Sequence, residues 1–168
     1  MPRIDFSALP DHGRLWVFPA SRRLDQNEVS TLLDEADAFL DSWAAHGVPL
    51  RSGRELRHDQ FLLVGVDEDA EAPSGCSIDA LVGRLRDLGR GFGVTLVEHA
   101  PVWYREAGDV CVVPRAVFRD LASAGTVGPD TAVFDTTLTR LGELRTEGLE
   151  RPARGAWHGA VFFRDASG

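Results

Sequence analysis

Phe61-Leu62-Leu63-Val64-Gly65-Val66 is a continuous apolar run with polar residues on both sides. A short run of this kind is typical of a strand that is buried on both faces at the centre of a sheet. The segment from Leu50 to Arg57 comes before it, and His58-Asp59 fits a tight turn between the two. We therefore expect two adjacent antiparallel strands, with the second in the middle of the sheet.

A strand and a helix are expected before this pair of strands. The segment Arg14-Leu15-Trp16-Val17-Phe18 is short, apolar and aromatic, and Pro19 ends it. Asp25 followed by Glu28 resembles a capping box, which marks a helix N-terminus. The apolar residues after it recur at helical spacing on one face: Val29, Leu32, Leu33, Ala36, Phe39, Leu40 and Trp43. Gly47 stands where a C-terminal cap is expected.

A second helix and another strand are expected after the pair of adjacent strands. The polar loop Asp67 to Pro73 leads into a second helix from about Ser77 to Arg90, which Gly91 and Gly93 end. Val94-Thr95-Leu96-Val97 then has the composition of a strand. The resulting order, β-α-β-β-α-β, predicts an α+β protein with a ferredoxin-like split βαβ core.

The remaining residues predict a C-terminal extension of one hairpin and an α-β-α run. The expected elements are a hairpin of Val102 to Tyr104 with Val110 to Val113 turning at Ala107-Gly108, a short helix from Pro114, a strand at Ala132 to Phe134, a helix at Thr137 to Arg145, and a docked tail at Pro152 to Gly168. No linker or repeat separates these parts. We expect residues 1–168 to form one domain, with a core of about 14–98 and an extension of about 99–168; a core with an appended subdomain is the alternative.

Composition restricts the class of protein. The chain has 168 residues, 43% hydrophobic and 26% charged, as expected of a folded globular domain. No apolar stretch approaches the length of a membrane span, and Met1 to Phe6 lacks the apolar core of a signal peptide, so we expect a cytoplasmic protein. Two distant cysteines, Cys76 and Cys111, do not make a disulfide framework. The net charge of −8 argues against binding to nucleic acid through phosphate contacts.

Several chemistries are excluded by residues that the chain lacks. All 18 basic residues are arginine, so neither a Schiff-base lysine nor a phosphate-binding loop ending in Gly-Lys-Ser/Thr is present. Gly89 to Gly93 is rich in glycine but ends a helix, unlike a dinucleotide-binding loop. The sequence contains residues of the types that bind metals, namely Cys76, His46, His99 and Asp67. None of them forms a closely spaced pair such as CxxC or HExxH, so we expect neither a metal nor a cofactor.

The expected topology gathers polar residues at one rim of the core. If the first strand runs up, the first helix ends at the bottom, the second central strand ends there, and the second helix begins there. The residues delivered to this rim are Trp43, His46, Asp67, Glu68, Cys76, Ser77 and Asp79, with Glu98 and His99 at the end of the last strand. We expect these side chains to lie near one another.

The segment Ser74 to Asp79 is the expected centre of the site. A helix N-terminus favours the thiolate of Cys76, and His46 could serve as its base. The carboxylates of Asp67, Glu68 and Asp79 oppose thiolate formation. Ser74, Ser77 and Asp79 would also be explained by helix capping alone. His158, beside Trp157, belongs to the site only if the tail folds over the rim.

Three segments resemble a family of short, uncharacterised bacterial proteins. They are Arg14 to Phe18, Phe39 to Gly47, and Val66-Asp67-Glu68 with Ser74 to Asp79; a looser match continues through Phe134 to Trp157-His158. Members of this family are often labelled ABC transporter ATPases, which the absence of lysine and of a Walker A loop contradicts here. The resemblance implies no activity, but it singles out Trp43, His46, Asp67, Glu68 and Ser74 to Asp79.

Two functions remain open from the sequence. One is a non-catalytic module that binds a protein or small molecule at the rim, with Trp43, Asp67, Glu68, Ser74, Gly75, Ser77 and His158 as binding residues. A homo-oligomer is one form such binding could take. The other is a thiol-dependent enzyme acting on a small molecule, with Cys76, His46 and Asp79 as catalytic residues.

Overall fold

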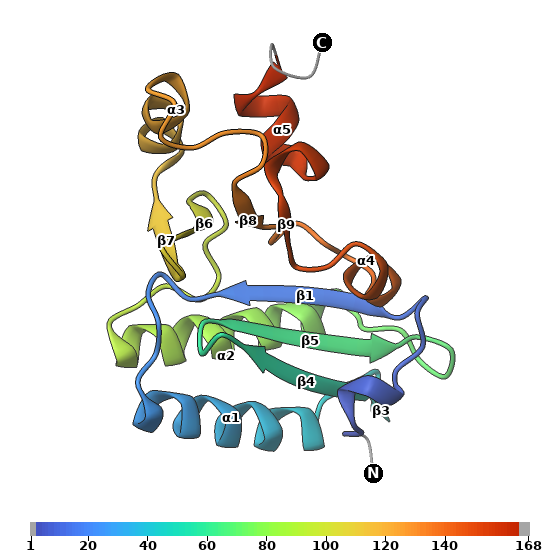
Figure 1. Cartoon of the computed structure of the whole chain (residues 1–168). Coiled ribbons are helices and arrows are strands. Elements are labelled where there is room, and N and C mark those ends of the chain that lie inside the picture. The colour runs from blue at the N-terminus through green and yellow to red at the C-terminus, as the bar shows by residue number, and fades with distance from the viewer. Residues whose placement is uncertain (1–2, 165–168) are drawn as a thin grey trace. The chain divides into compact units, whose positions relative to one another are not determined.

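The computed structural model describes residues 3–164 and contains both helices and antiparallel sheets, which confirms the expected α+β class (Figure 1). It divides into two compact units. The first unit contains the chain up to Glu98 together with Leu138–Thr146, and the second contains His99–Thr137 and the residues from Glu147 onward. Within residues 3–164, no helix has the length and apolar character of a membrane span.

The first unit is built on a three-stranded antiparallel sheet of order β1-β5-β4. Its elements are η1 (Phe6–Ala8), β1 (Arg14–Pro19), α1 (Gln26–Asp41), β2 (Ala44–Ala45), β3 (Val48–Pro49), β4 (Arg51–Arg57), β5 (Phe61–Asp67), α2 (Gly75–Phe92) and α4 (Leu141–Thr146). β5 is the central strand, as its continuous apolar sequence predicts. Phe61 to Val66 are all buried, because both faces of the sheet are covered.

Different elements cover the two faces of this sheet. α1 and α2 cover one face (Figure 1), and their apolar residues form a single core with Phe18, Leu62 and Val64. On the other face, Gly65 brings the backbone of β5 so close to Leu9 and Leu141 that a Cβ atom there would lie 2.8 Å and 3.2 Å from their side chains. The strand therefore carries glycine where α4 and the N-terminal segment approach it.

The first helix begins as expected and ends earlier than expected. Asp25 and Glu28 form the capping box that the sequence predicts. The helix ends at Asp41 with Ser42 as its C-cap, so the prediction of Gly47 as the cap is wrong. His46 and Gly47 instead form the turn of the small β2–β3 hairpin, both with positive φ, because a two-residue turn of this hand requires it.

The predicted fourth strand at Val94 to Val97 is absent. Val94 and Leu96 are buried and alternate with more exposed residues. Within residues 3–164, however, the segment makes one backbone–backbone bond near the end of β1, from Ser21 N–H to the carbonyl of Thr95, while Thr95 N–H donates to the Ser21 hydroxyl instead of to a strand. The free edge of β1 is partly occupied elsewhere, since Leu15 N–H donates to the carbonyl of Thr139. A four-stranded ferredoxin-like sheet is therefore not completed.

The second unit has a four-stranded sheet of order β7-β6-β8-β9. Its elements are β6 (Val102–Glu106), β7 (Asp109–Val113), α3 (Arg115–Ser123), β8 (Ala132–Phe134), β9 (Glu150–Pro152), η2 (Ala153–Gly155) and α5 (Trp157–Phe162). The hairpin at Ala107-Gly108, the helix after Pro114 and the strand at Ala132 to Phe134 are confirmed. The tail forms α5, whose Trp157 and Phe162 join the core around Phe118; residues 165–168 lie outside the described part.

The predicted helix at Thr137 to Arg145 begins only at Leu141. The N–H and hydroxyl groups of Thr137 both donate to the Asp135 carboxylate, and the N–H groups of Thr139 and Arg140 donate to Glu143. Side-chain carboxylates thus accept hydrogen bonds from the backbone N–H groups of the residues before the helix. These bonds hold Thr139 and Arg140 in an extended conformation beside β1.

Candidate functional site

The first unit contains a pocket of about 790 Å³ where the end of α1, the β2–β3 hairpin and the start of α2 meet. Its lining residues are Phe39, Ser42, Trp43, Ala44, His46, Ser74, Gly75, Cys76, Ser77 and Ala80. Trp43, His46, Ser74, Gly75, Cys76 and Ser77 were all expected at one rim. The structure brings these six residues together from segments about 30 residues apart.

Trp43 forms a fixed aromatic wall of the pocket. Its ring is buried and lies 5.8 Å from the ring centroids of both Trp16 and Phe39. The indole Nε1–H donates to the carbonyl of Ser77 over 2.8 Å, so the ring is tied to the first turn of α2. A side chain held by both packing and a hydrogen bond offers a ligand a surface that is already ordered.

The N-terminus of α2 forms the polar side of the pocket. The Ser74 hydroxyl caps the helix by accepting from the N–H of Ser77, and the hydroxyl of Ser77 donates back to the carbonyl of Ser74. The backbone N–H groups of Gly75 and Cys76 have no acceptor within the described part of the chain. Unpaired amides at the start of an 18-residue helix attract a negatively charged group.

The three proposed catalytic residues are not joined in a catalytic arrangement. Cys76 and His46 are both exposed and line the same pocket. Between residues 3 and 164, however, no hydrogen bond connects the thiol to the imidazole. Asp79 is exposed and does not line the pocket. The pocket therefore holds a thiol and an imidazole without the nucleophile–base hydrogen bond that is typical of nucleophilic catalysis.

Asp67 and Glu68 do not line the pocket, although the topology argument placed them at the same rim. Asp67 ends β5 and its carboxylate lies 3.5 Å from Arg51. A carboxylate oxygen of Glu68 lies 3.5 Å from Arg140, without the geometry of a hydrogen bond. Both residues serve ion pairs on the surface of the first unit.

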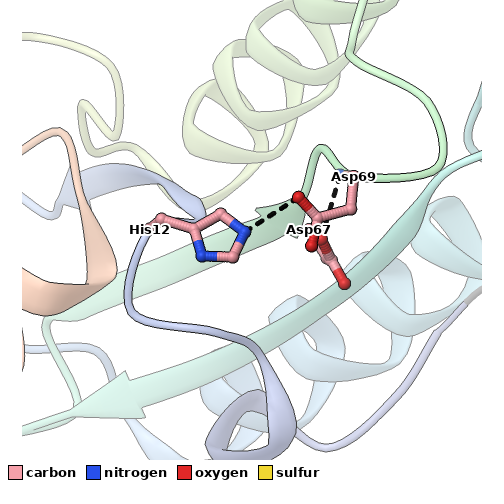
Figure 2. A group of neighbouring side chains, drawn as sticks. All are labelled: His12, Asp67 and Asp69. Atoms are coloured by element: carbon pink, nitrogen blue, oxygen red, sulfur yellow. Dashed lines mark hydrogen bonds and ion pairs between the residues drawn. The ribbon is translucent and has the colours of Figure 1, made fainter.

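Asp67 instead belongs to a group with His12 and Asp69 (Figure 2). His12 Nε2 lies 2.9 Å from the Asp69 carboxylate, and ligand atoms of all three residues lie within 4.8 Å of one another. Within residues 3–164 this is the group with the donor types and spacing to hold a cation, although the His12 side chain is 62% exposed. Sequence reasoning missed His12 because only the β1–β5 register, extended two residues beyond Arg14 and Val66, places it beside this loop.

The two remaining histidines of interest lie in the second unit. His99 begins that unit. His158 is only 1% exposed and its ring stacks on Trp157 at 3.9 Å, so it is part of a core and not of a rim. Burial lowers the pKa of His158 to about 4, against the smaller opposing effect of Asp135. The role proposed for His158 at the Ser74 to Asp79 site does not agree with this burial.

Comparison of the chain with protein-family models, with curated proteins and with solved structures gave no significant match.

Proposed function

We propose that the first unit is a non-catalytic ligand-binding module whose ligand carries an anionic group beside an apolar or aromatic body. The observation that carries this proposal is the pocket that combines the Trp43 wall with the unpaired amides of Gly75 and Cys76. The amides would receive a carboxylate or phosphate, and the apolar part would contact Trp43 and Phe39 where they line the pocket.

The charge of the pocket lining supports an anionic ligand. The chain has 26 acidic residues and a net charge of −8, yet none of the ten lining residues is Asp or Glu. His46, which is exposed at the hairpin turn, adds a donor that becomes cationic on protonation. An anion in this pocket would meet donors and no carboxylate.

Filling the pocket should weaken binding. Ala80 lines the pocket and is exposed, so Ala80→Phe should occupy the space beside Trp43 and weaken binding by at least about tenfold, roughly 1.4 kcal/mol. Benzoate and phenyl phosphate serve as probes, with amide NMR shifts of Gly75 and Cys76 as the measurement. Asp87→Phe is the matched control, because it places the same side chain two turns further along the same helix face, outside the pocket. Probes that leave both amide signals unchanged, or that bind Ala80→Phe as well as the wild type, would count against the proposal.

A thiol-dependent enzyme is the second candidate, favoured by one observation. Cys76 is exposed in the same pocket as His46, so a bound substrate would meet the sulfur. This candidate requires ligand binding to bring the imidazole within hydrogen-bond reach of the thiol. It shares its site with the first proposal and differs only in what happens to the ligand.

Thiol titration should separate the two cysteines. Near pH 7.5 a disulfide reagent should label Cys76 in a fast phase and Cys111 slowly, because Cys111 is half-buried and its pKa is raised by burial and by the carboxylates of Glu106 and Asp109. The fast phase should disappear in Cys76→Ser. A fast phase that slows in His46→Ala would favour the enzyme, and one that is unchanged would favour simple binding. Labelling of Cys76 only after denaturation would remove the enzyme candidate.

We also propose that the first unit is a ferredoxin-like arrangement reduced to three strands. The order β1-β5-β4, with α1 between β1 and β4, supports a split βαβ core. The resemblance to the family of short bacterial proteins supports the same pocket, since it singles out Trp43, His46 and the Ser74 to Asp79 segment.

A further inference from the structure

The outer strand of the second unit, β7, has an unpaired edge. β7 pairs only with β6, through a hairpin whose turn residues are Ala107 and Gly108. In a hairpin with a two-residue turn the flanking pair, Glu106 and Asp109, is hydrogen-bonded. Alternation along the strand then directs the N–H and C=O groups of Val110 and Val112 away from β6. These groups have no partner within residues 3–164.

The other edges of the three-stranded and four-stranded sheets are covered or blunted. The edge of β4 receives the N–H of Ile4 on the carbonyl of Ser52, and the edge of β1 meets Thr139. β9 has three residues and ends in Pro152, which has no backbone N–H to donate to another strand. In β7 such residues stand only at the ends, where Asp109 begins the strand and Pro114 follows it; Val110 to Val113 contain neither proline nor charge. Because folded proteins normally protect their sheet edges, an unprotected apolar edge indicates a surface that is paired in use.

An apolar groove continues this edge at its C-terminal end. The groove has a volume of about 320 Å³ and is lined by Ala100, Pro101, Val112, Val113, Pro114 and Arg115. Val117, in the first turn of α3, is a further apolar side chain that is 41% exposed. The edge and the groove together offer backbone hydrogen bonds and a site for apolar side chains, the two components of strand addition.

Opposite charges lie at the start of β7 and at the start of the helix α3 that follows it. Asp109 lies three residues before Val112 and has no ion pair within the described residues. Arg115 lies three residues after Val112; its Nε donates to the carbonyl of Ala100 and its guanidinium lies 4.5 Å from the centroid of the Trp157 ring. In an antiparallel copy of β7 rotated about Val112, the Asp109 end of each strand would come near the start of α3 of the other copy, where Arg115 lies, so this proximity occurs twice.

We propose that the chain forms a symmetric dimer through β7, with the two-fold axis at Val112. In this register Val112 exchanges both backbone hydrogen bonds with Val112 of the second copy, and Val110 faces Pro114. Pro114 lacks an N–H but accepts through its carbonyl, so the pairing tolerates it. The apolar edge is then paired with an equally apolar edge, and each Asp109 gains a cation.

A charge swap tests the proposal. Sedimentation velocity of the wild-type protein should show a mass that rises from 18.3 kDa toward twice that value as concentration increases. Asp109→Arg and Arg115→Asp should each weaken dimerisation by about tenfold or more, and the double variant should restore it, because the pairs are re-formed with exchanged signs. Thermal unfolding of each variant establishes that it is folded. A monomer at all concentrations up to about 1 mM, or a folded double variant that does not recover, overturns the proposal.

Crosslinking tests the register. In a background with Cys76→Ser and Cys111→Ser, Val112→Cys should form an intermolecular disulfide under mild oxidation, because residues of a hydrogen-bonded pair have Cα atoms about 5.5 Å apart. Val117→Cys is the control for random collision, since it is exposed but not on the axis. Crosslinking of Val117→Cys as fast as Val112→Cys would overturn this arrangement.

Discussion

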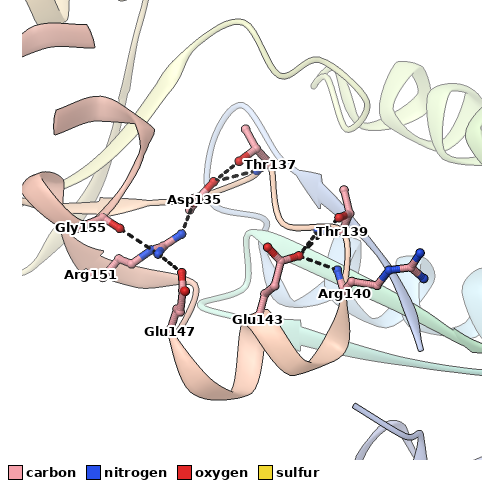
Figure 3. A network of polar contacts seen from close by, with 8 residues as sticks. All are labelled: Asp135, Thr137, Thr139, Arg140, Glu143, Glu147, Arg151 and Gly155. Atoms are coloured by element: carbon pink, nitrogen blue, oxygen red, sulfur yellow. Dashed lines mark hydrogen bonds and ion pairs between the residues drawn. The ribbon is translucent and has the colours of Figure 1, made fainter. Parts of the chain in front are cut away.

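Asp135→Ala should lower the free energy of unfolding by about 3 kcal/mol, one of the two largest effects expected in this protein. The Asp135 carboxylate accepts from the N–H and hydroxyl groups of Thr137 and forms an ion pair with Arg151 (Figure 3). The exposed fractions of the two paired side chains are 5% and 12%. Removing the carboxylate leaves a nearly buried guanidinium without its buried partner, and a cation in that position is costly.

The expected loss of unfolding free energy lies at the lower end of the range for buried ion pairs because Arg151 keeps two other partners. Its guanidinium also contacts the Glu147 carboxylate and the carbonyl of Gly155. Glu147→Ala is the matched control: it removes the other carboxylate of the same arginine, but Glu147 is 57% exposed, so the cost should be at most about 1 kcal/mol. Urea unfolding gives both values. Equal losses for the two variants would contradict the importance of burial.

Acid should destabilise the second unit through His158. Burial holds the pKa of His158 at about 4 in the folded protein, below its ordinary value of 6.5. The folded state therefore prefers the neutral ring, and this preference is fully present above pH 6.5. As the pH falls from 6.5 to 4 the unfolded state binds the proton first, and about 3 kcal/mol of stability should be lost. The charged groups that act on the ring are Asp135, Arg115 and Arg151.

The comparison of wild type with His158→Gln isolates this effect. Carboxylates make every protein sensitive to acid, so the informative quantity is the difference in unfolding free energy between the two proteins at each pH. The difference should change by about 3 kcal/mol between pH 7 and pH 4, in the direction that favours the variant at low pH. Parallel curves for the two proteins would show that the buried ring does not control acid stability.

Sequence patterns predicted those parts of the fold that local physics decides. The apolar run of β5, the capping box of α1 and the hairpin at Ala107-Gly108 each follow from residues within a few positions of one another. The fourth strand was predicted wrongly because its partner edge on β1 is met by Thr139, 44 residues beyond Thr95. Competition for a sheet edge between distant segments leaves no local pattern.

The candidate pocket was predicted in part for the same reason. Strand and helix directions brought Trp43 and His46 to the start of α2, and they line one pocket with Cys76. Those directions give only the end of the molecule on which a residue lies. Which side chains turn inward depends on partners such as Arg51 for Asp67 and Arg140 for Glu68, which the patterns did not predict. The burial of His158 and Asp135 likewise depends on packing within the second unit.

The return of Leu138–Thr146 to the first unit has a consequence for synthesis of the chain on the ribosome. The strands and both long helices of the first unit are translated by residue 98, but the face of β5 beside Gly65 is completed only when Leu141 has emerged. During that interval the nascent sheet exposes an apolar surface, and a chaperone that shields it would be needed most at this stage. A fragment that ends at Glu98 should retain the same exposed surface permanently and aggregate, so a single cut in the gene cannot release the complete first unit.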